Sequence, residues 1–92
     1  MIQINKHDEI EIGDIIFNSR FNTYIFVDTM TQDEKGFIVH GPMFQIDQTI
    51  FYLRSNQYLL KDRMWKVTSS DTERIKDIYR TLFKIKKSVK LR

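Results

Sequence analysis

The residues with the clearest chemical potential are basic and lie at the end of the chain. The segment RTLFKIKKSVKLR, residues 80–92, contains six lysines or arginines and no acid. Such a segment binds polyanions, or it solvates the exposed end of a helix and complements the helix dipole. Both alternatives stay open, and we take nine of the ten basic residues from position 63 onward as candidate nucleic-acid contacts. They are Arg63, Lys66, Lys76, Arg80, Lys84, Lys86, Lys87, Lys90 and Arg92.

The distribution of charge decides which partners suit this segment. Residues 1–62 contain five basic and nine acidic residues, whereas residues 63–92 contain ten basic and three acidic ones. The acidic part repels phosphates, so only the C-terminal part suits DNA or RNA. An acidic protein surface is the alternative partner. A membrane surface is the least favoured, because few apolar residues accompany the last lysines.

Residues that could perform catalysis or bind a metal are sparse. His7 and His40 are far apart in the sequence, no cysteine is present, and we expect turn or surface roles for both histidines. Asp14 and Asp28 could form an acid and base pair only if they face each other across neighbouring strands. The three glycines share no phosphate-binding motif. We therefore expect no catalysis, no cofactor and no metal.

A second candidate contact lies in the segment NSRFN, residues 18–22, which we expect to form a loop. Arg20 and Phe21 would place a cation and a large apolar ring at its tip, an arrangement that favours a protein partner. Trp65 is expected to pack in the core, since it alternates in phase with Val67.

Length and composition limit the class of protein. Ninety-two residues suffice for one domain, and without cysteine no disulfide framework is available. No apolar run approaches the roughly 18 residues of a membrane span, and the N-terminus is acidic where a signal peptide is basic. We expect a cytoplasmic chain, and the oligomeric state is left open.

The bulk of the chain is predicted to be β-sheet. It has no alanine, whereas isoleucine, valine and threonine together supply 24 residues beside 12 aromatic ones. Such side chains fit a pleated sheet better than a helix. A bend is expected at Gly13, a hairpin turn ending at Gly36 and a further turn at Ser55 and Asn56. The expected strands are residues 9–17, 23–31, 37–41, 48–54, 57–60 and 63–67.

Short strands at close spacing favour a strongly bent antiparallel sheet that closes into a small barrel. The pattern resembles the SH3-like small barrels of phage and prophage proteins, through Gly13 and Asp14, the YIFV and GFIVHG segments and WKV at residues 65–67. The resemblance covers about residues 10–67. It implies a β-rich α+β fold in which a barrel of five or six strands, at about residues 9–68, is followed by a helix.

The C-terminal helix is predicted at about residues 71–87, with the basic tail at 84–92. A capping box formed by Ser70 and Glu73 marks its start. One face is apolar and would pack on the barrel: Ile75, Ile78, Tyr79 and Leu82. The opposite face is basic: Lys76, Arg80, Lys84 and Lys87.

These observations predict a small non-enzymatic binding module, phage-encoded and cytoplasmic, that binds nucleic acid through its basic C-terminal helix. The alternative is a protein-binding factor or inhibitor that modulates a host protein complex. That factor would use the NSRFN loop, an open strand edge or the helix.

Overall fold

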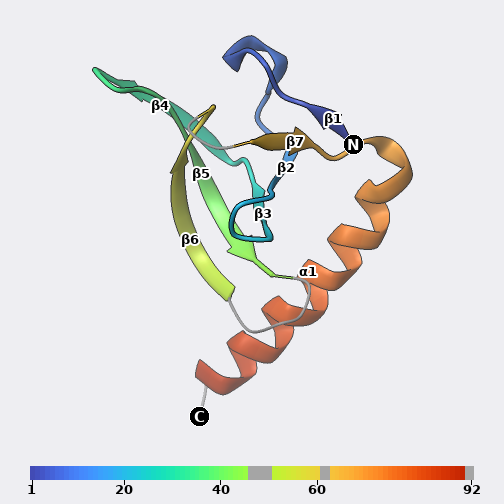
Figure 1. Cartoon of the computed structure of the whole chain (residues 1–92). Helices are drawn as coiled ribbons and strands as arrows, with labels where there is room; N and C mark the ends of the chain where they lie inside the picture. The colour runs from blue at the N-terminus through green and yellow to red at the C-terminus, as the bar shows by residue number, and fades with distance from the viewer. Residues whose placement is uncertain (46–50, 61–62, 91–92) are drawn as a thin grey trace.

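The three-dimensional structure is a computed structural model that describes residues 1–45, 51–60 and 63–90. Strands dominate the described chain, and one long helix follows them (Figure 1). In chain order the elements are β1 (Ile2–Gln3), the 3-10 helix η1 (His7–Glu9), β2 (Ile15–Asn18), β3 (Thr23–Phe26), β4 (Thr29–Asp33), β5 (Gly36–Phe44), β6 (Phe51–Tyr58), β7 (Met64–Lys66) and α1 (Ser69–Lys90).

All described strands belong to one antiparallel sheet in the order β1-β7-β2-β3-β5-β4, with β6 on the other edge of β5. The long strand β5 pairs with β4 through its first half and with β3 through its second half. The prediction of a β-rich antiparallel fold with a C-terminal helix is confirmed. Its physical basis is the wealth of β-branched and aromatic side chains, which pack well on a pleated sheet.

The predicted closure into a barrel is wrong. Within the described residues, β6 pairs with β5 alone, and no pairing joins β6 to β7. The second edge of β7 is occupied instead by β1, since Ile2 pairs with Lys66 and the Ile4 N–H donates to the Met64 carbonyl oxygen at 2.9 Å. A strand whose two edges are both paired has no backbone groups left for β6.

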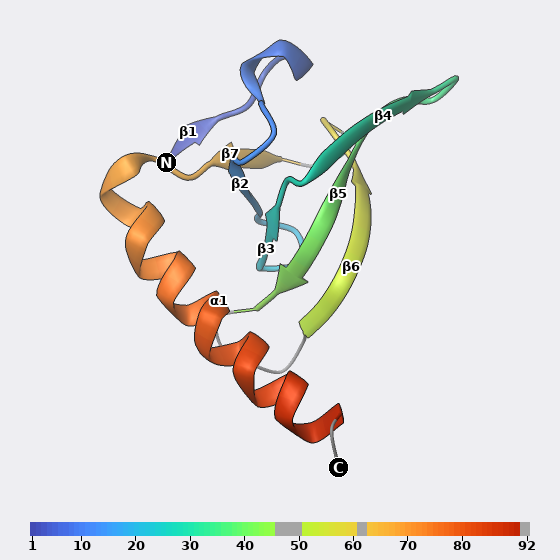
Figure 2. The same cartoon turned by 180° about the vertical axis from the view of Figure 1, so that it is seen from behind.

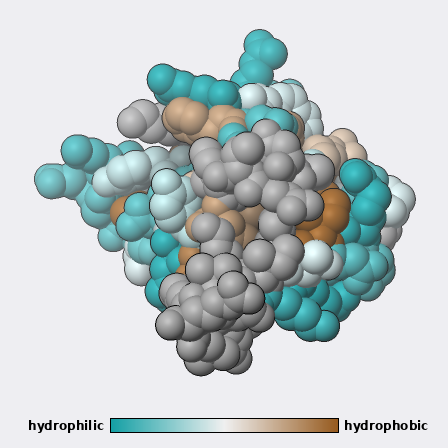
Figure 3. Space-filling view, turned by 90° about the horizontal axis from the view of Figure 1, so that it is seen from below, coloured by the Kyte–Doolittle hydropathy of each residue, from teal (hydrophilic) through white to brown (hydrophobic). Residues whose placement is uncertain are grey.

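The sheet buries apolar side chains on both faces. One core cluster centres on Ile16, Ile25 and Val39, on the inside of the curved sheet. The other includes Tyr24 and lies under α1, which runs along the outer face of the sheet (Figure 2). In the view from below, apolar areas lie between hydrophilic side chains (Figure 3).

The expectation that strand 23–31 is central and covered on both faces is confirmed for β3. Its side chains Tyr24 and Ile25 point to opposite faces and are 5% and 1% exposed. β3 lies between β2 and β5. β4, which follows β3 in the chain, runs in the same direction and pairs with the first half of β5.

The hairpin turn at Gly36 forms as predicted. Asp33 pairs with Gly36, which has φ +137°, and the Asp33 carboxylate accepts the Lys35 N–H at 2.8 Å. Such an aspartate turn together with a glycine at positive φ is a typical hairpin connection.

Several of the predicted strand limits are wrong. The strand expected at residues 23–31 is interrupted after Phe26, and β4 begins at Thr29. Residues 9–12 are not a strand, and Ile12 is 66% exposed. β5 does not stop at Gly41, because the absence of a side chain there lets the backbone pass the Phe26 carbonyl. β6 continues through Ser55 and Asn56, which pair with β5 instead of turning the chain.

The start of α1 also differs from the predicted capping box. The Thr68 carbonyl oxygen accepts the Thr72 N–H at 3.1 Å and the Thr72 hydroxyl at 2.9 Å, which makes Thr68 the residue that begins the helix. Ser70 therefore lies inside the first turn, and its hydroxyl lies 3.3 Å from that of Thr68. On the sheet side Ile75 is fully buried, and Ile78 and Tyr79 pack beside it.

Candidate binding pocket

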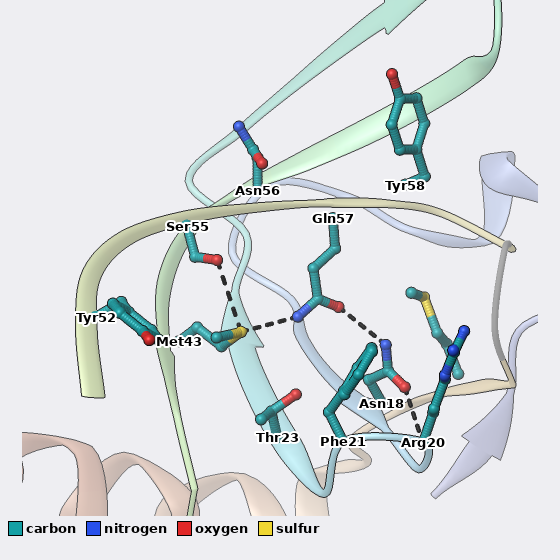
Figure 4. Close-up of a pocket in the computed structure, with 11 residues that line it drawn as sticks. Asn18, Arg20, Phe21, Thr23, Met43, Tyr52, Ser55, Asn56, Gln57 and Tyr58 are labelled. Carbon is teal, nitrogen blue, oxygen red and sulfur yellow. Dashed lines mark hydrogen bonds between the residues drawn. The ribbon is translucent and has the colours of Figure 1, made fainter. Parts of the chain in front are cut away.

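A pocket of about 440 Å³ lies where the sheet fails to close. The β2–β3 loop, residues 19–22, and the adjoining ends of β2 and β3 form one wall, and β6 forms the opposite wall (Figure 4). This volume falls in the range of sites that hold a small molecule or a single large side chain. No acidic residue is among the described residues that line it.

A β-bulge sets which β6 side chains face the pocket. Gly41 pairs with Ser55 and Met43 pairs with Tyr52, so β6 uses three residue steps where β5 uses two. The extra residue changes the alternation along β6, and Tyr52, Ser55 and Gln57 all line the pocket. Phe51, next to Tyr52, packs on the opposite face against Tyr79 at a ring distance of 6.0 Å.

A short chain of polar contacts joins the two walls. The Asn18 side-chain amide donates to Gln57 Oε1 at 3.3 Å, and Asn18 Oδ1 accepts the Arg20 N–H at 3.0 Å. Gln57 Nε2 donates to Met43 Sδ at 2.9 Å, and the Ser55 hydroxyl lies 3.6 Å from the same sulfur. A thioether sulfur is a weak acceptor, so the hydrogen bond from the Gln57 amide to Met43 is weak.

Thr23 contributes a buried hydroxyl to the pocket. Its side chain is 1% exposed, and Thr23 Oγ1 has no hydrogen bond within the described residues. An unpaired buried hydroxyl destabilises a fold by about 1–3 kcal/mol. Figure 4 shows this hydroxyl pointing toward the region between Met43, Gln57 and Phe21. A ligand atom in that region would be the natural partner of the hydroxyl.

The rim of the pocket is aromatic and basic. Phe21 and Tyr52 expose 52% and 54% of their surface. The Arg20 guanidinium carbon lies 5.1 Å from the centre of the Phe21 ring, within cation–π range. The carbonyl oxygen of Arg63 accepts the Ser19 N–H at 3.3 Å, so the backbone of this exposed residue contacts the same loop.

The predicted basic residues belong to two parts of the chain. Arg63 and Lys66 lie at β7, and the others belong to α1 and the residues after it. Arg63 lies beside the β2–β3 loop, at the end of β7 remote from α1. Lys66 lies 3.5 Å from the Asp14 carboxylate, and Arg80 pairs with Asp77 at 2.8 Å.

The remaining candidates belong to α1 and to the residues after it. Lys76 and Lys84 have no acidic partner within the described part of the chain, and Lys84 is exposed. The side chains of Lys86, Lys87 and Lys90, and all of Arg92, lie outside the described structure.

Each of the candidate acids and histidines contacts a different residue. Asp28 lies 3.6 Å from Arg54, while Asp14 pairs with Lys66, so the two aspartates are engaged separately. His7 stacks on Phe37 at 3.9 Å. His40 is not at a strand end as expected, because β5 continues past it. Its Nε2 lies 2.6 Å from the Thr31 hydroxyl.

Among the described residues no cluster of three potential metal ligands occurs. Trp65, expected in the core, is half-buried, with its ring 6.3 Å from that of Phe17.

One carboxyl group near the pocket has a shifted pKa. The Tyr58 hydroxyl donates to the Asp33 carboxylate at 2.5 Å, and this hydrogen bond lowers the pKa of Asp33. The same contact raises the pKa of Tyr58. Tyr58 lines the pocket, but its hydroxyl is thus directed toward the β4–β5 hairpin.

Sequence reasoning located Arg20 and Phe21 but missed the polar interior of the pocket. Asn18 could have been noticed as a polar residue that closes the apolar run IIF, yet it was assigned to the loop. Gln57 and Tyr52 carry no comparable signal, since their orientation depends on the bulge in β6.

Comparisons of the chain with protein-family models, with curated proteins and with solved structures found no match. In the described residues, no helix has the length and apolar character needed to cross a membrane.

Proposed function

We propose that this protein is a non-enzymatic binding module for single-stranded nucleic acid. The observation that carries the proposal is the pocket rim, where the rings of Phe21 and Tyr52 are exposed and the Arg20 guanidinium lies 5.1 Å from the centre of the Phe21 ring. The backbone of Arg63 contacts the same loop. Proteins that bind single strands combine aromatic side chains, on which bases stack, with cations that follow the phosphates. Although residues 1–62 contain more acidic than basic residues, none of the described residues that line the pocket is acidic.

The basic C-terminal helix is proposed to supply the sequence-independent part of the affinity. Arg74 and Arg80 pair with acids of their own helix, whereas Lys76 and Lys84 have no such partner in the described chain. Lys84 is exposed and Lys76 is half-buried, and lysines at a protein surface bind phosphates by releasing counterions. Lys86, Lys87, Lys90 and Arg92 extend the same segment in the sequence.

The other expectations from the sequence remain part of the proposal. The separate ion pairs of Asp14 and Asp28 support a non-enzymatic role. We also propose a cytoplasmic, phage-encoded protein related to the SH3-like small barrels. The strand opened by Gly13 and Asp14 pairs with the strand that contains Trp65, which supports this kinship.

A protein partner is the second candidate, and the edge of β6 favours it. Within the described residues no strand covers this edge, so its backbone groups could pair with a strand from another chain. Tyr52 and Phe21 are also residue types that dominate protein interfaces. The basic rim favours the polyanion over this alternative.

The test is a titration of a fluorescein-labelled single-stranded oligonucleotide at several salt concentrations. Replacing Arg63 and the lysines of the helix by glutamine should weaken binding, and the slope of log affinity against log salt should flatten by roughly 0.7 for each lost phosphate contact. The lysines to replace are Lys84, Lys86, Lys87 and Lys90.

A double variant, Lys6→Gln with Lys35→Gln, is the matched control. Both lysines are exposed, and they lie in the N-terminal segment and at the β4–β5 turn, away from the pocket rim and α1. It removes positive charge of the same type and should leave affinity and slope nearly unchanged. A wild-type protein that binds no oligonucleotide at low salt would refute the proposal and leave the protein partner.

A further inference from the structure

The interior of the pocket between β6 and the β2–β3 loop contains polar groups that are poorly hydrogen-bonded. The buried hydroxyl of Thr23 has no hydrogen-bond partner within the described residues, although Thr23 lies in a strand, opposite Asn18 of β2, where valine has the same shape. Nothing in the packing of β3 requires the hydroxyl. Its presence points to a polar atom of a ligand.

Gln57 is the second pocket residue whose hydrogen bonding a ligand could improve. Its Nε2 donates to the sulfur of Met43 at 2.9 Å, and its Oε1 accepts from Asn18 at 3.3 Å. Replacing the weak sulfur contact by a good acceptor would be favourable. A primary amide then presents one donor and one acceptor side by side, which matches the edge of a nucleobase.

The walls specify the shape of the ligand. Thr23 lies between Tyr52 and Phe21 in the view of Figure 4, and both rings are about half exposed. Exposed rings around a polar interior suit a flat heterocycle that stacks with its face and forms hydrogen bonds with its edge. The volume of about 440 Å³ admits such a group. The Arg20 guanidinium, next to the Phe21 ring, is the cation that would bind the phosphate of the same nucleotide.

We propose that the pocket binds one unstacked nucleobase, with Phe21 and Tyr52 as stacking surfaces and with Thr23 and Gln57 reading its edge. This inference rests on the proposed function, and adds to it a base-specific site distinct from the basic helix. The helix supplies affinity for any strand, whereas the pocket supplies preference for unpaired and particular bases.

The experiment compares short homopolymeric deoxyoligonucleotides of the four bases with a strand of equal length whose sugars lack bases. The wild-type protein should bind the abasic strand about 5- to 150-fold more weakly than the best homopolymer, as expected for loss of base stacking. Phe21→Ala should reduce this difference. Ile12→Ala, at another large exposed apolar residue, should not.

The role of the hydroxyl is tested by a pair of substitutions at one position. Thr23→Val should weaken binding of the preferred homopolymer by about 2- to 12-fold with little effect on the others. Thr23→Ser keeps the hydroxyl and should keep the preference. The salt slope should stay unchanged in both, since neither touches a phosphate contact.

The outcomes separate this inference from the proposed function. If homopolymers and the abasic strand bind equally with a steep salt slope, the pocket inference is wrong and nucleic-acid binding stands. The same holds if Thr23→Val leaves the preference among bases unchanged. If no strand binds, both are wrong.

Discussion

Replacement of Thr23 by valine is expected to stabilise the fold. Valine keeps the branched shape of threonine and suits a strand. It removes a buried hydroxyl that has no partner among the residues the structure describes. The unpaired hydroxyl destabilises the folded state by about 1–3 kcal/mol, so Thr23→Val should raise the free energy of unfolding by a similar amount.

Thermal and urea denaturation, followed by circular dichroism in the absence of nucleic acid, measure this change. For a chain of this size each kcal/mol corresponds to about 4–8 °C in the melting temperature. Thr31→Val is the control for a paired hydroxyl, because Thr31 lies in β4, which pairs with β5 as β3 does, and its exposed hydroxyl lies 2.6 Å from His40 Nε2. Loss of that contact should leave stability unchanged or lower it by about 0.5–1.5 kcal/mol.

The reasoning is refuted if Thr23→Val is less stable than the wild-type protein. That result would mean that the hydroxyl has a partner in the free protein and is part of the fold, so it could not mark a ligand site. Equal changes in Thr23→Val and Thr31→Val would also contradict it, since they would remove the distinction between a paired and an unpaired hydroxyl.

Three further predictions concern the fold. Gly41→Ala should destabilise it by about 3 kcal/mol or more, because the added methyl carbon would lie 1.6 Å from the carbonyl oxygen of Phe26; an unchanged urea midpoint would contradict this. Tyr58→Phe should raise the pKa of Asp33 toward its ordinary value in an NMR titration. In the wild-type protein that pKa is lowered, so the contribution of the pair to stability is present above the unfolded-state pKa and disappears as the pH falls through the folded-state pKa. Truncation after Ser70 removes nearly all of α1 and should cause aggregation or a large loss of stability, and equal melting temperatures would disprove the packing of α1 on the sheet.

The parts of the fold that depend on local patterns could be predicted from the sequence. The β-rich sheet, the turn at Gly36, the double coverage of β3 and the C-terminal helix all follow from side-chain type and periodicity. The closure of the sheet could not, because it depends on β1. That strand has two residues, and its pairing with β7 joins distant parts of the chain.

The same limit applies to the pocket. Arg20 and Phe21 could be identified because a cation and a ring in a loop are conspicuous locally. Gln57 and Tyr52 share one side of β6 only because the bulge opposite Gly41 and Met43 changes the alternation. A period of two read from the sequence assigns Tyr52 and Gln57 to opposite faces.

Several features of the pocket lower the stability of the folded protein. Thr23 leaves a buried hydroxyl unpaired, Gln57 donates to a sulfur, and β6 gives up regular pairing at its bulge. Phe21 and Tyr52 expose large rings beside them. A sequence chosen for folding alone would avoid each of these, since valine and leucine at positions 23 and 57 fill similar space without polar groups. Several residues that are unfavourable for folding and lie close together are typical of a functional site. There a bound ligand supplies the hydrogen bonds and contacts that the free protein lacks. The pocket, rather than the basic helix, is therefore where we expect the specificity of this protein.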